Sequence, residues 1–136
     1  MSSSNLAVVR EIYEAFGRGD VSGIVDRVAE SVEWEYGGSL EDVPWLRPRR
    51  GRAGALEFFS SLAALEIESF TPKVFLEGPG LVVVLIDVVA TVKATGRRFR
   101  EEDEVHIWHF DEAHRVSRFR HRVDTRQQLA ACLADR

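Results

Sequence analysis

The sequence predicts an α+β fold, with helices in its first half and an antiparallel sheet in its second half. Three observations agree on this. Apolar residues at helical spacing dominate before residue 65, apolar and polar residues alternate after residue 70, and short turn sequences separate the alternating runs. Helices segregated from hairpin-linked strands are typical of α+β domains. A curved sheet wrapped around helices leaves a cavity at its open end, where we expect a ligand to bind.

The composition indicates an ordinary globular protein. With 136 residues, 45% of them hydrophobic and 29% charged, we expect one domain over residues 1–136. The longest apolar run, Leu81–Ile86, is too short to span a membrane, and a net charge of −4 argues against nucleic acid as a partner. The single cysteine, Cys132, excludes an internal disulfide framework. Because no secretory signal is visible at the start, we expect a cytoplasmic location.

The first half predicts three helices and one strand. Asn5 can cap a first helix, and Asp20 can cap a second. Alternation from Val32 to Tyr36 predicts a strand, and the apolar spacing from Arg52 to Leu65 predicts the third helix. We expect an irregular loop over residues 37–52.

The second half predicts four strands joined by tight turns. They are Phe70–Glu77, Leu81–Thr95, Arg97–Phe110 and Arg115–Val123. A possible capping box at Thr125–Gln128 then predicts a short helix that runs through Leu133.

Turn length sets which residues face each other across the last two hairpins. If Glu112-Ala113 forms the tip of the last hairpin, Glu104 lies opposite His121 and His106 lies opposite Phe119. If Thr95-Gly96 forms the tip of the preceding hairpin, Asp87 lies opposite Glu104. One sheet face then gathers Asp87, Glu104, His106 and His121 among Leu85, Trp108 and Phe119. These pairs hold unless a β-bulge interrupts either hairpin.

This polar cluster suits acid–base chemistry. A carboxylate beside an imidazole fixes the tautomer of the ring and raises its basicity, and one of two carboxylates in an apolar pocket can stay protonated. The alternative is a Glu104–His121 pair on a solvated face. Asp87 interrupts the most apolar stretch of the chain, where a carboxylate is costly unless it is paired or functional. The alternative for Asp87 is a bend or a sheet margin.

Aromatic and basic residues supply further candidates. A flat or cyclic molecule could be held by Trp34, Tyr36, Trp45, Phe59, Trp108 and Phe119, which could equally be core residues. Four arginines crowd one loop: Arg47, Arg49, Arg50 and Arg52. They either clamp an acidic ligand or lie in solvent and pair with Glu41 and Asp42. The histidines and acids lack the spacing of a metal site, so we expect neither a metal nor another cofactor.

Four stretches of the chain resemble one family pattern. They are Gly19-Asp20-x3-Ile24 with Val32-x-Trp34, Gly51-Arg52-x3-Leu56-x-Phe58-Phe59, Glu104-x-His106-x-Trp108-x-Phe110, and Arg118-Phe119-Arg120-x3-Asp124-Thr125. From about residue 5 to 133, the chain resembles the SnoaL-like branch of the nuclear transport factor 2-like, or ketosteroid isomerase-like, superfamily. The resemblance implies a cone-shaped α+β barrel with a deep pocket, and a homodimer formed through the outer sheet face. That face is the one on which the registers place Asp103, Arg118, Arg120 and Arg122.

The resemblance also bears on chemistry, residue by residue. Tyr36 and Ile12 stand at the positions of the catalytic base and tyrosine of ketosteroid isomerase, so that constellation is absent, while His106 falls near its second acid. Asp124 is similar in position to the acid/base aspartate of SnoaL-type polyketide cyclases. His106, His121 and Asp87 are similar in kind to the scytalone dehydratase pattern. Close SnoaL-like relatives often carry tyrosine where this chain has Arg122.

Two hypotheses about function follow. The first is a cofactor-independent isomerase, cyclase or dehydratase that acts on a cyclic or aromatic carbonyl compound. In it, His121 is a base oriented by Glu104, and His106 and Asp87 are a partner acid or oxyanion donor. The alternative is a non-catalytic ligand-binding or dimeric accessory protein of the same fold, because fold analogy does not choose between them.

Overall fold

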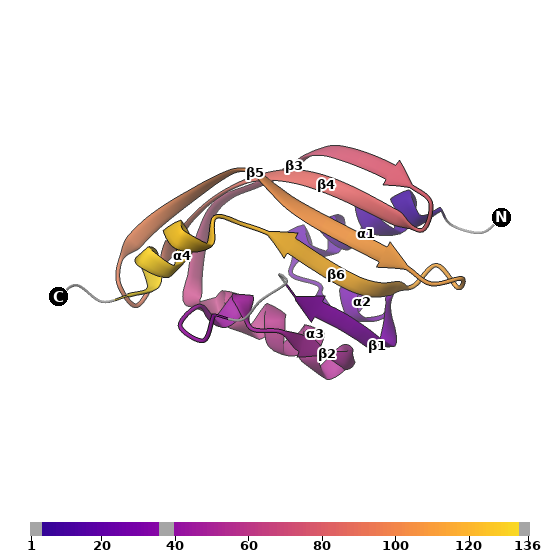
Figure 1. The fold of residues 1–136 in the computed structure, drawn as a ribbon, viewed down its shortest axis with the longest axis horizontal. Helices are drawn as coiled ribbons and strands as arrows, with labels where there is room; N and C mark the ends of the chain where they lie inside the picture. Colours follow the sequence, from indigo (N-terminus) through magenta and orange to yellow (C-terminus); the bar gives the residue numbers. More distant parts are fainter. Residues whose placement is uncertain (1–3, 36–39, 134–136) are drawn as a thin grey trace.

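The computed structural model describes residues 4–35 and 40–133, and within them it contains four α-helices, two short 3-10 helices and six strands (Figure 1). In chain order these are α1 (Asn5–Arg18), α2 (Val21–Val25), β1 (Val28–Glu35), η1 (Pro44–Leu46), β2 (Arg49–Arg50), α3 (Gly51–Ser61), η2 (Leu62–Ala64), β3 (Leu65–Gly78), β4 (Leu81–Val92), β5 (Arg97–Phe110), β6 (Val116–Arg122) and α4 (Thr125–Cys132). The expected α+β class is confirmed. The third helix is shorter than predicted, and β3 begins where that helix was expected to end.

Two of the three predicted helix caps lie one residue earlier than the sequence patterns suggest. Ser4, not Asn5, caps α1, since its hydroxyl oxygen accepts a hydrogen bond from the Ala7 amide. Asp124, not Thr125, caps α4 by accepting from the Gln127 amide. Asp20 caps α2 as predicted, with the Gly23 amide as donor. In each case the cap precedes the helix and bonds the amide three residues later, which satisfies a helix-end donor.

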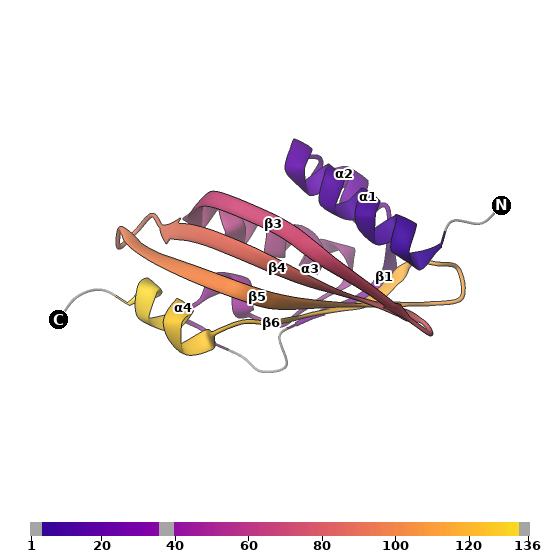
Figure 2. The ribbon, with the colours of Figure 1, turned by 90° about the horizontal axis from the view of Figure 1, so that it is seen from above.

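The strands form one curved sheet in the order β2-β1-β6-β5-β4-β3. β1 runs parallel to β6, so the sheet is mixed and not purely antiparallel as predicted. Turn sequences reveal hairpins, whereas this pairing joins residues more than 80 positions apart, and no local pattern announces it. Figure 1 shows β3, β4 and β5 bending over the helices. In both views α4 lies at the end of the molecule opposite the start of α1 (Figures 1 and 2).

The hydrophobic core fills the concave side of this sheet. Every second residue of β4 from Val82 to Val92 is buried there, while its neighbours are only partly covered. Val9 and Ile12 of α1 and Ala55 of α3 are buried in the same cluster. The apolar face of β4, formed by every second residue, thus packs against the apolar face of α1, formed by residues three to four positions apart.

The β5–β6 register differs from the predicted one by two residues. His106 lies opposite His121, and Trp108 lies opposite Phe119. The predicted Glu104–His121 pair is therefore wrong, because the turn after Phe110 is longer than a two-residue tip and the register also shifts beside His109. A shift of two preserves the alternation of side chains, so these residues still share the inner face.

A β-bulge in β5 breaks the predicted β4–β5 register, and Asp87 lies on the outer face, between the inward-facing Ile86 and Val88. Ile86 pairs with Glu104 and Val88 with Glu101, so two residues of β5 lie opposite Asp87 alone. Asp103 takes a left-handed conformation with φ of 62°, and its amide donates to Asp87 Oδ1 over 3.1 Å. On that outer face, Lys73 Nζ lies 2.9 Å from Asp87 Oδ1, and its ammonium lowers the pKa of the Asp87 carboxyl. The predicted inner position of Asp87, and of Leu85 beside it, is wrong.

Substitutions at the bulge test its conformation. We expect Asp103→Gly to leave the free energy of unfolding within about 1 kcal/mol of wild type, because glycine accepts positive φ and the exposed Lys73 pair contributes little. Asp103→Val should cost about 1–2 kcal/mol or more, since a β-branched residue is strained there. Urea unfolding measures both. Glu102→Val, at the neighbouring exposed position, is the matched control, and an equal cost at Glu102 would contradict the assigned strain.

Candidate functional site

A cavity of about 80 Å³ lies between the inner sheet face and the helices. Five of the six predicted pocket residues line it: Trp34, Trp45, Phe59, Trp108 and Phe119. The sixth, Tyr36, lies outside the described residues. The walls are mainly aromatic and aliphatic, and the polar side chains that face the cavity come from α1, β5, β6 and α4. A largely apolar cavity with few polar groups is the usual form of a small-molecule site.

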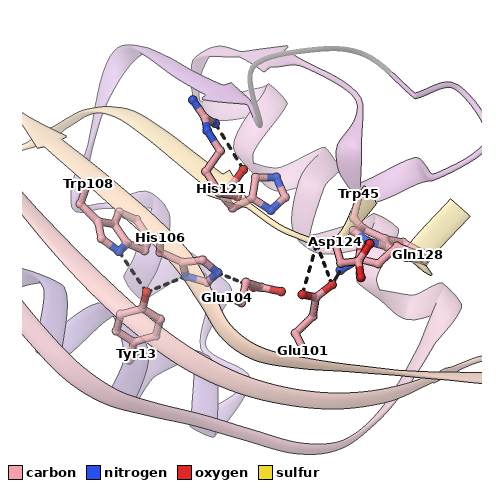
Figure 3. A network of polar contacts seen from close by, with 10 residues as sticks. Tyr13, Trp45, Glu101, Glu104, His106, Trp108, His121, Asp124 and Gln128 are labelled. Carbon is pink, nitrogen blue, oxygen red and sulfur yellow. Dashed lines mark hydrogen bonds and ion pairs between the residues drawn. The ribbon is translucent and has the colours of Figure 1, made fainter. Parts of the chain in front are cut away.

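A chain of three hydrogen bonds crosses one wall of the cavity (Figure 3). Trp108 Nε1 donates to Tyr13 Oη over 3.0 Å. Tyr13 Oη lies 2.6 Å from His106 Nδ1, and His106 Nε2 lies 2.6 Å from Glu104 Oε2. Tyr13 belongs to α1 and the other three to alternate positions of β5, so the chain joins the helix to the sheet. The two short contacts mark strong hydrogen bonds.

With Glu104 as a carboxylate, the groups at its two ends set the direction of this chain. An indole N–H can only donate, and a carboxylate can only accept. Tyr13 Oη receives the Trp108 hydrogen, and His106 Nδ1 is the only acceptor beside it among the described residues, so the Tyr13 proton points to His106 Nδ1. Burial raises the pKa of Tyr13 well above its ordinary value, which keeps that proton in place. His106 then accepts at Nδ1 and donates from Nε2 to Glu104, which makes it a neutral imidazole of one tautomer.

Glu104 keeps one oxygen outside this chain. Its Oε2 accepts from His106, whereas Oε1 has no hydrogen-bond partner among the residues that the structure describes. The side chain is 8% exposed and lines the cavity, and Figure 3 shows the second oxygen pointing away from His106. The result is an oriented carboxylate with an accepting oxygen free for a ligand.

His121 is a buried imidazole that, unlike His106, has no hydrogen-bonded side chain to orient it among the described residues. It is 4% exposed, and within residues 4–35 and 40–133 no side chain hydrogen-bonds its ring. Burial above all, then the nearby His106, Arg122 and Arg49, lower the pKa of His121 to about 3, so the ring is neutral near pH 7. Glu104 therefore orients His106 and not His121, contrary to the prediction. A neutral imidazole offers one donor and one acceptor but is a weak base.

The two aspartates predicted to be catalytic lie away from the cavity. Asp87 lies on the outer face with Lys73, and Asp124 is exposed at the start of α4, where its carboxylate caps the helix. Neither lines the cavity. Asp124 could enter the inner face only if the end of β6 were bulged, and α4 begins there instead. The structure therefore brings together three of the five predicted catalytic residues: Glu104, His106 and His121.

A second polar network closes the other end of the cavity (Figure 3). Trp45 Nε1 donates to Gln128 Oε1 over 2.6 Å, and Gln128 Nε2 donates to Glu101 Oε2 over 2.9 Å. Glu101 also accepts from the Asp124 amide. It is 6% exposed, and burial raises its pKa. These bonds hold α4 and η1 against β5, so that Trp45 and Gln128 form part of the cavity wall.

Sequence reasoning missed Tyr13, Glu101 and Gln128. A tyrosine on the buried face of a helix needs a partner for its hydroxyl group, so Tyr13 itself was a signal of this network in the sequence. Gln128 faces the core from a short helix in the same way. Glu101 faces inward because of the bulge in β5. The sequence gives no sign of this bulge within Glu101–Glu104, because four consecutive acidic residues show no alternation of apolar and polar positions.

The four arginines of the 37–52 loop do not meet in one site. Arg47 donates to the Glu41 carbonyl oxygen, and its guanidinium lies 3.8 Å from the Glu41 carboxylate, so the expected pairing with Glu41 is confirmed for Arg47. Arg50 pairs with Glu33 at 3.5 Å, and Arg52 donates to the Val28 carbonyl. Arg49 lies 4.0 Å from Glu57. None of the four lines the cavity within the described ranges.

No group of three or more histidine, cysteine, aspartate or glutamate side chains in the described ranges is placed to hold a metal ion. Of the helices that the structure describes, none has the length and apolar character needed to cross a membrane.

Comparison with solved structures places this fold among known ones. The chain is similar to a nuclear transport factor 2-like protein of unknown function from Burkholderia pseudomallei, with 27% identity, a TM-score of 0.82 and coverage of 97% of this chain and 100% of that one. It is similar to TerC co-crystallised with polyporic acid, at 21% identity, a TM-score of 0.77 and coverage of 96% and 98%. A Mycobacterium tuberculosis LEH-like epoxide hydrolase matches at 12% identity and a TM-score of 0.68, covering 94% and 88%. No curated protein matches the sequence.

The family itself is shown by the sequence. Residues 9–119 match the model of the SnoaL-like domain, which spans most of the chain. The fold, with its curved sheet over three helices, agrees with the nuclear transport factor 2-like neighbours. The chain belongs to the SnoaL-like family of the nuclear transport factor 2-like superfamily.

Proposed function

We propose that the cavity binds a small cyclic or aromatic carbonyl compound and performs cofactor-independent acid–base chemistry on it, as an isomerase, cyclase or dehydratase. One observation carries this proposal: the directed chain from Trp108 to Glu104 leaves a single carboxylate oxygen free at the wall of a largely apolar cavity. A carboxylate held in one orientation among apolar walls suits proton abstraction next to a carbonyl group.

Glu104 is the proposed base. Its Oε1 takes a proton from a carbon next to the ligand carbonyl, and the C–H electron pair moves to form an enolate. The neutral His121 donates a hydrogen bond to the enolate oxygen, as an uncharged imidazole can do. In an isomerisation Glu104 returns the proton to another carbon. In a dehydration the protonated Glu104 gives it to the departing β-hydroxyl group, which leaves as water as the C–C double bond forms. In a cyclisation the enolate carbon attacks a second carbonyl, and the alkoxide formed there takes the proton from Glu104.

His106, Tyr13 and Trp108 are positioning residues in this scheme. His106 holds Glu104 Oε2, Tyr13 fixes the tautomer of His106, and Trp108 fixes the Tyr13 hydroxyl. This division differs from the sequence-based one, in which His121 was the base. His121 lacks a carboxylate partner and its pKa is low, so it serves better as a donor.

The alternative is a binding protein without chemistry. The observation that favours it is the size of the cavity, about 80 Å³, because aromatic side chains occupy much of the space inside the sheet. In that case the polar groups serve recognition only. The structural likeness to TerC and to an epoxide hydrolase, at 21% and 12% identity, supports the fold and leaves both alternatives open.

Proton abstraction can be tested without knowing the natural substrate. We expect the protein to accelerate hydrogen–deuterium exchange next to the carbonyl of 2-tetralone in D₂O, followed by NMR. Glu104→Gln should lower that rate by about 10²–10⁴-fold, because the accepting oxygen becomes part of an amide. Glu102→Gln removes the same charge from an exposed neighbour and should leave the rate unchanged. Equal rates for wild type and Glu104→Gln would exclude Glu104 as the base.

We also infer a homodimer formed through the outer sheet face. Val83, Leu85, Val105 and Ile107 are only partly buried there and form an aliphatic strip across β4 and β5. Beside it, Arg118 pairs with Glu33 at 3.0 Å and Arg120 with Glu35 at 2.8 Å. An aliphatic centre with a charged margin is the usual anatomy of a protein interface.

A charge placed in the aliphatic strip tests the dimer. Ile107→Arg should convert a dimer to a monomer in sedimentation velocity at micromolar concentration, because a buried unpaired charge opposes association. Glu112→Arg, in the exposed turn between β5 and β6, is the control and should remain dimeric. A wild-type protein that sediments as a monomer would contradict the inference.

A further inference from the structure

The charges that face the cavity are unevenly distributed. Within the described part of the chain, its lining contains four ionisable side chains and neither lysine nor arginine; the four are Tyr13, Glu104, His106 and His121. Tyr13 keeps its proton, the hydrogen-bond direction makes His106 neutral, and His121 is neutral as well. With Glu104 as a carboxylate, it carries the only charge on the lining; the buried Glu101 belongs to the network at the other end of the cavity.

This carboxylate disfavours an anionic ligand. Two like charges in a cavity with apolar walls repel more strongly than they do in water, because little solvent screens them. A ligand that brings a carboxylate or phosphate would also lose its hydration without gaining a cationic partner. The free Oε1 of Glu104 instead calls for a group that donates a hydrogen bond.

The opposite side of the cavity disfavours a cation. His121 lies within the electrostatic reach of Arg49 and Arg122, the two guanidinium groups that help to keep it neutral. The Arg49 side chain is only 11% exposed, so solvent screens its charge poorly. A ligand oxygen that accepts a hydrogen bond from the His121 imidazole is favoured in this field, whereas an ammonium group is opposed on this side of the cavity. At Glu104 an ammonium group would gain a carboxylate partner but would lose its hydration among apolar walls.

We propose that the cavity selects an uncharged planar ring compound whose hydroxyl or enol group donates to Glu104 Oε1 while an oxygen of the same ligand accepts from His121. This rests on the proposed function and narrows its substrate class to neutral hydroxyaryl or enolisable ring compounds. Ring acids are disfavoured by the Glu104 carboxylate, and ring amines by the guanidinium groups near His121 and by the loss of ammonium hydration in an apolar cavity. The selectivity comes from electrostatics at two defined residues and applies whether or not a reaction follows binding.

The present cavity must widen to admit such a ring. An engineered cavity of about 150 Å³ holds benzene, whereas this one has about 80 Å³. The side chains that can yield are the partly exposed rings of the lining: Phe16 lies 4.9 Å from Phe70 and 6.1 Å from Phe59, centroid to centroid. They come from α1, β3 and α3, so their rotation changes the volume without moving the sheet.

Three probes of similar size and different charge test the proposal: phenol, benzoate and benzylamine at neutral pH. All three tryptophans of the chain, Trp34, Trp45 and Trp108, line the cavity, so tryptophan fluorescence reports its occupancy. We expect phenol to bind at least about tenfold more tightly than either charged probe, which is the usual difference made by a hydrogen bond to a charged group.

Variants assign the selectivity to its residues. Glu104→Gln should weaken phenol binding by about tenfold and reduce the disadvantage of benzoate, whereas Glu102→Gln, with the same change of charge outside the cavity, should alter neither. His121→Phe should weaken phenol binding while His109→Phe on the outer face should not. Circular dichroism confirms that each variant is folded.

The outcomes separate this proposal from the proposed function. Tightest binding of benzoate or benzylamine, or an unchanged preference in Glu104→Gln, would overturn the charge selectivity and leave acid–base chemistry to the exchange assay. If none of the three probes changes the fluorescence at millimolar concentration, the selectivity proposal is wrong. Accelerated exchange in 2-tetralone would then still support the proposed function on its own.

Discussion

The extra residue that β5 inserts opposite Asp87 is the constraint on which the rest of the cavity depends. On the N-terminal side of this bulge, Phe99 and Glu101 face inward. On its C-terminal side, the inward-facing residues are Glu104, His106 and Trp108. Without the bulge, strict alternation would turn one of these two groups toward solvent. The bulge therefore places both polar networks on one face of β5. Opposite it, Asp87 faces outward by the unbroken alternation of β4, and Lys73 pairs with it.

This placement determines which polar groups face the cavity and in what form. Trp108 donates to Tyr13, Tyr13 donates to His106, and His106 donates to Glu104, where the chain of hydrogen bonds ends. His121, directly opposite His106 in the sheet, is left neutral and without a side-chain partner in the described residues. The site thus consists of one oriented acceptor and one neutral imidazole, enclosed by aromatic rings, and the proposed chemistry and ligand selectivity both derive from this pair.

Much of the fold could be predicted from the sequence, because hydrophobic period distinguishes helices from strands and turn residues mark hairpins. The shared face of Glu104, His106, Trp108, Phe119 and His121 was also predicted correctly, since a register error of two preserves side-chain alternation. The predicted position of Asp87, on the same face as Glu104, was wrong because of the bulge in β5. The four acidic residues 101–104 show no alternation of apolar and polar positions that would reveal it. The bulky apolar residues Phe99 and Trp108 were a signal of the bulge, because one is at an odd and the other at an even position, and strict alternation would put them on opposite faces. The Tyr13–His106 contact joins residues 93 positions apart, and no local pattern encodes it.

The direction of the hydrogen-bond chain is the central claim, and ¹⁵N NMR of the four histidine side chains tests it most directly. At neutral pH the account predicts that His106 is the neutral tautomer with its proton on Nε2, and that His121 is neutral and stays so far below the ordinary histidine pKa. A His106 ring that is doubly protonated, or that carries its only proton on Nδ1, would contradict the account, because Tyr13 could then no longer donate to it.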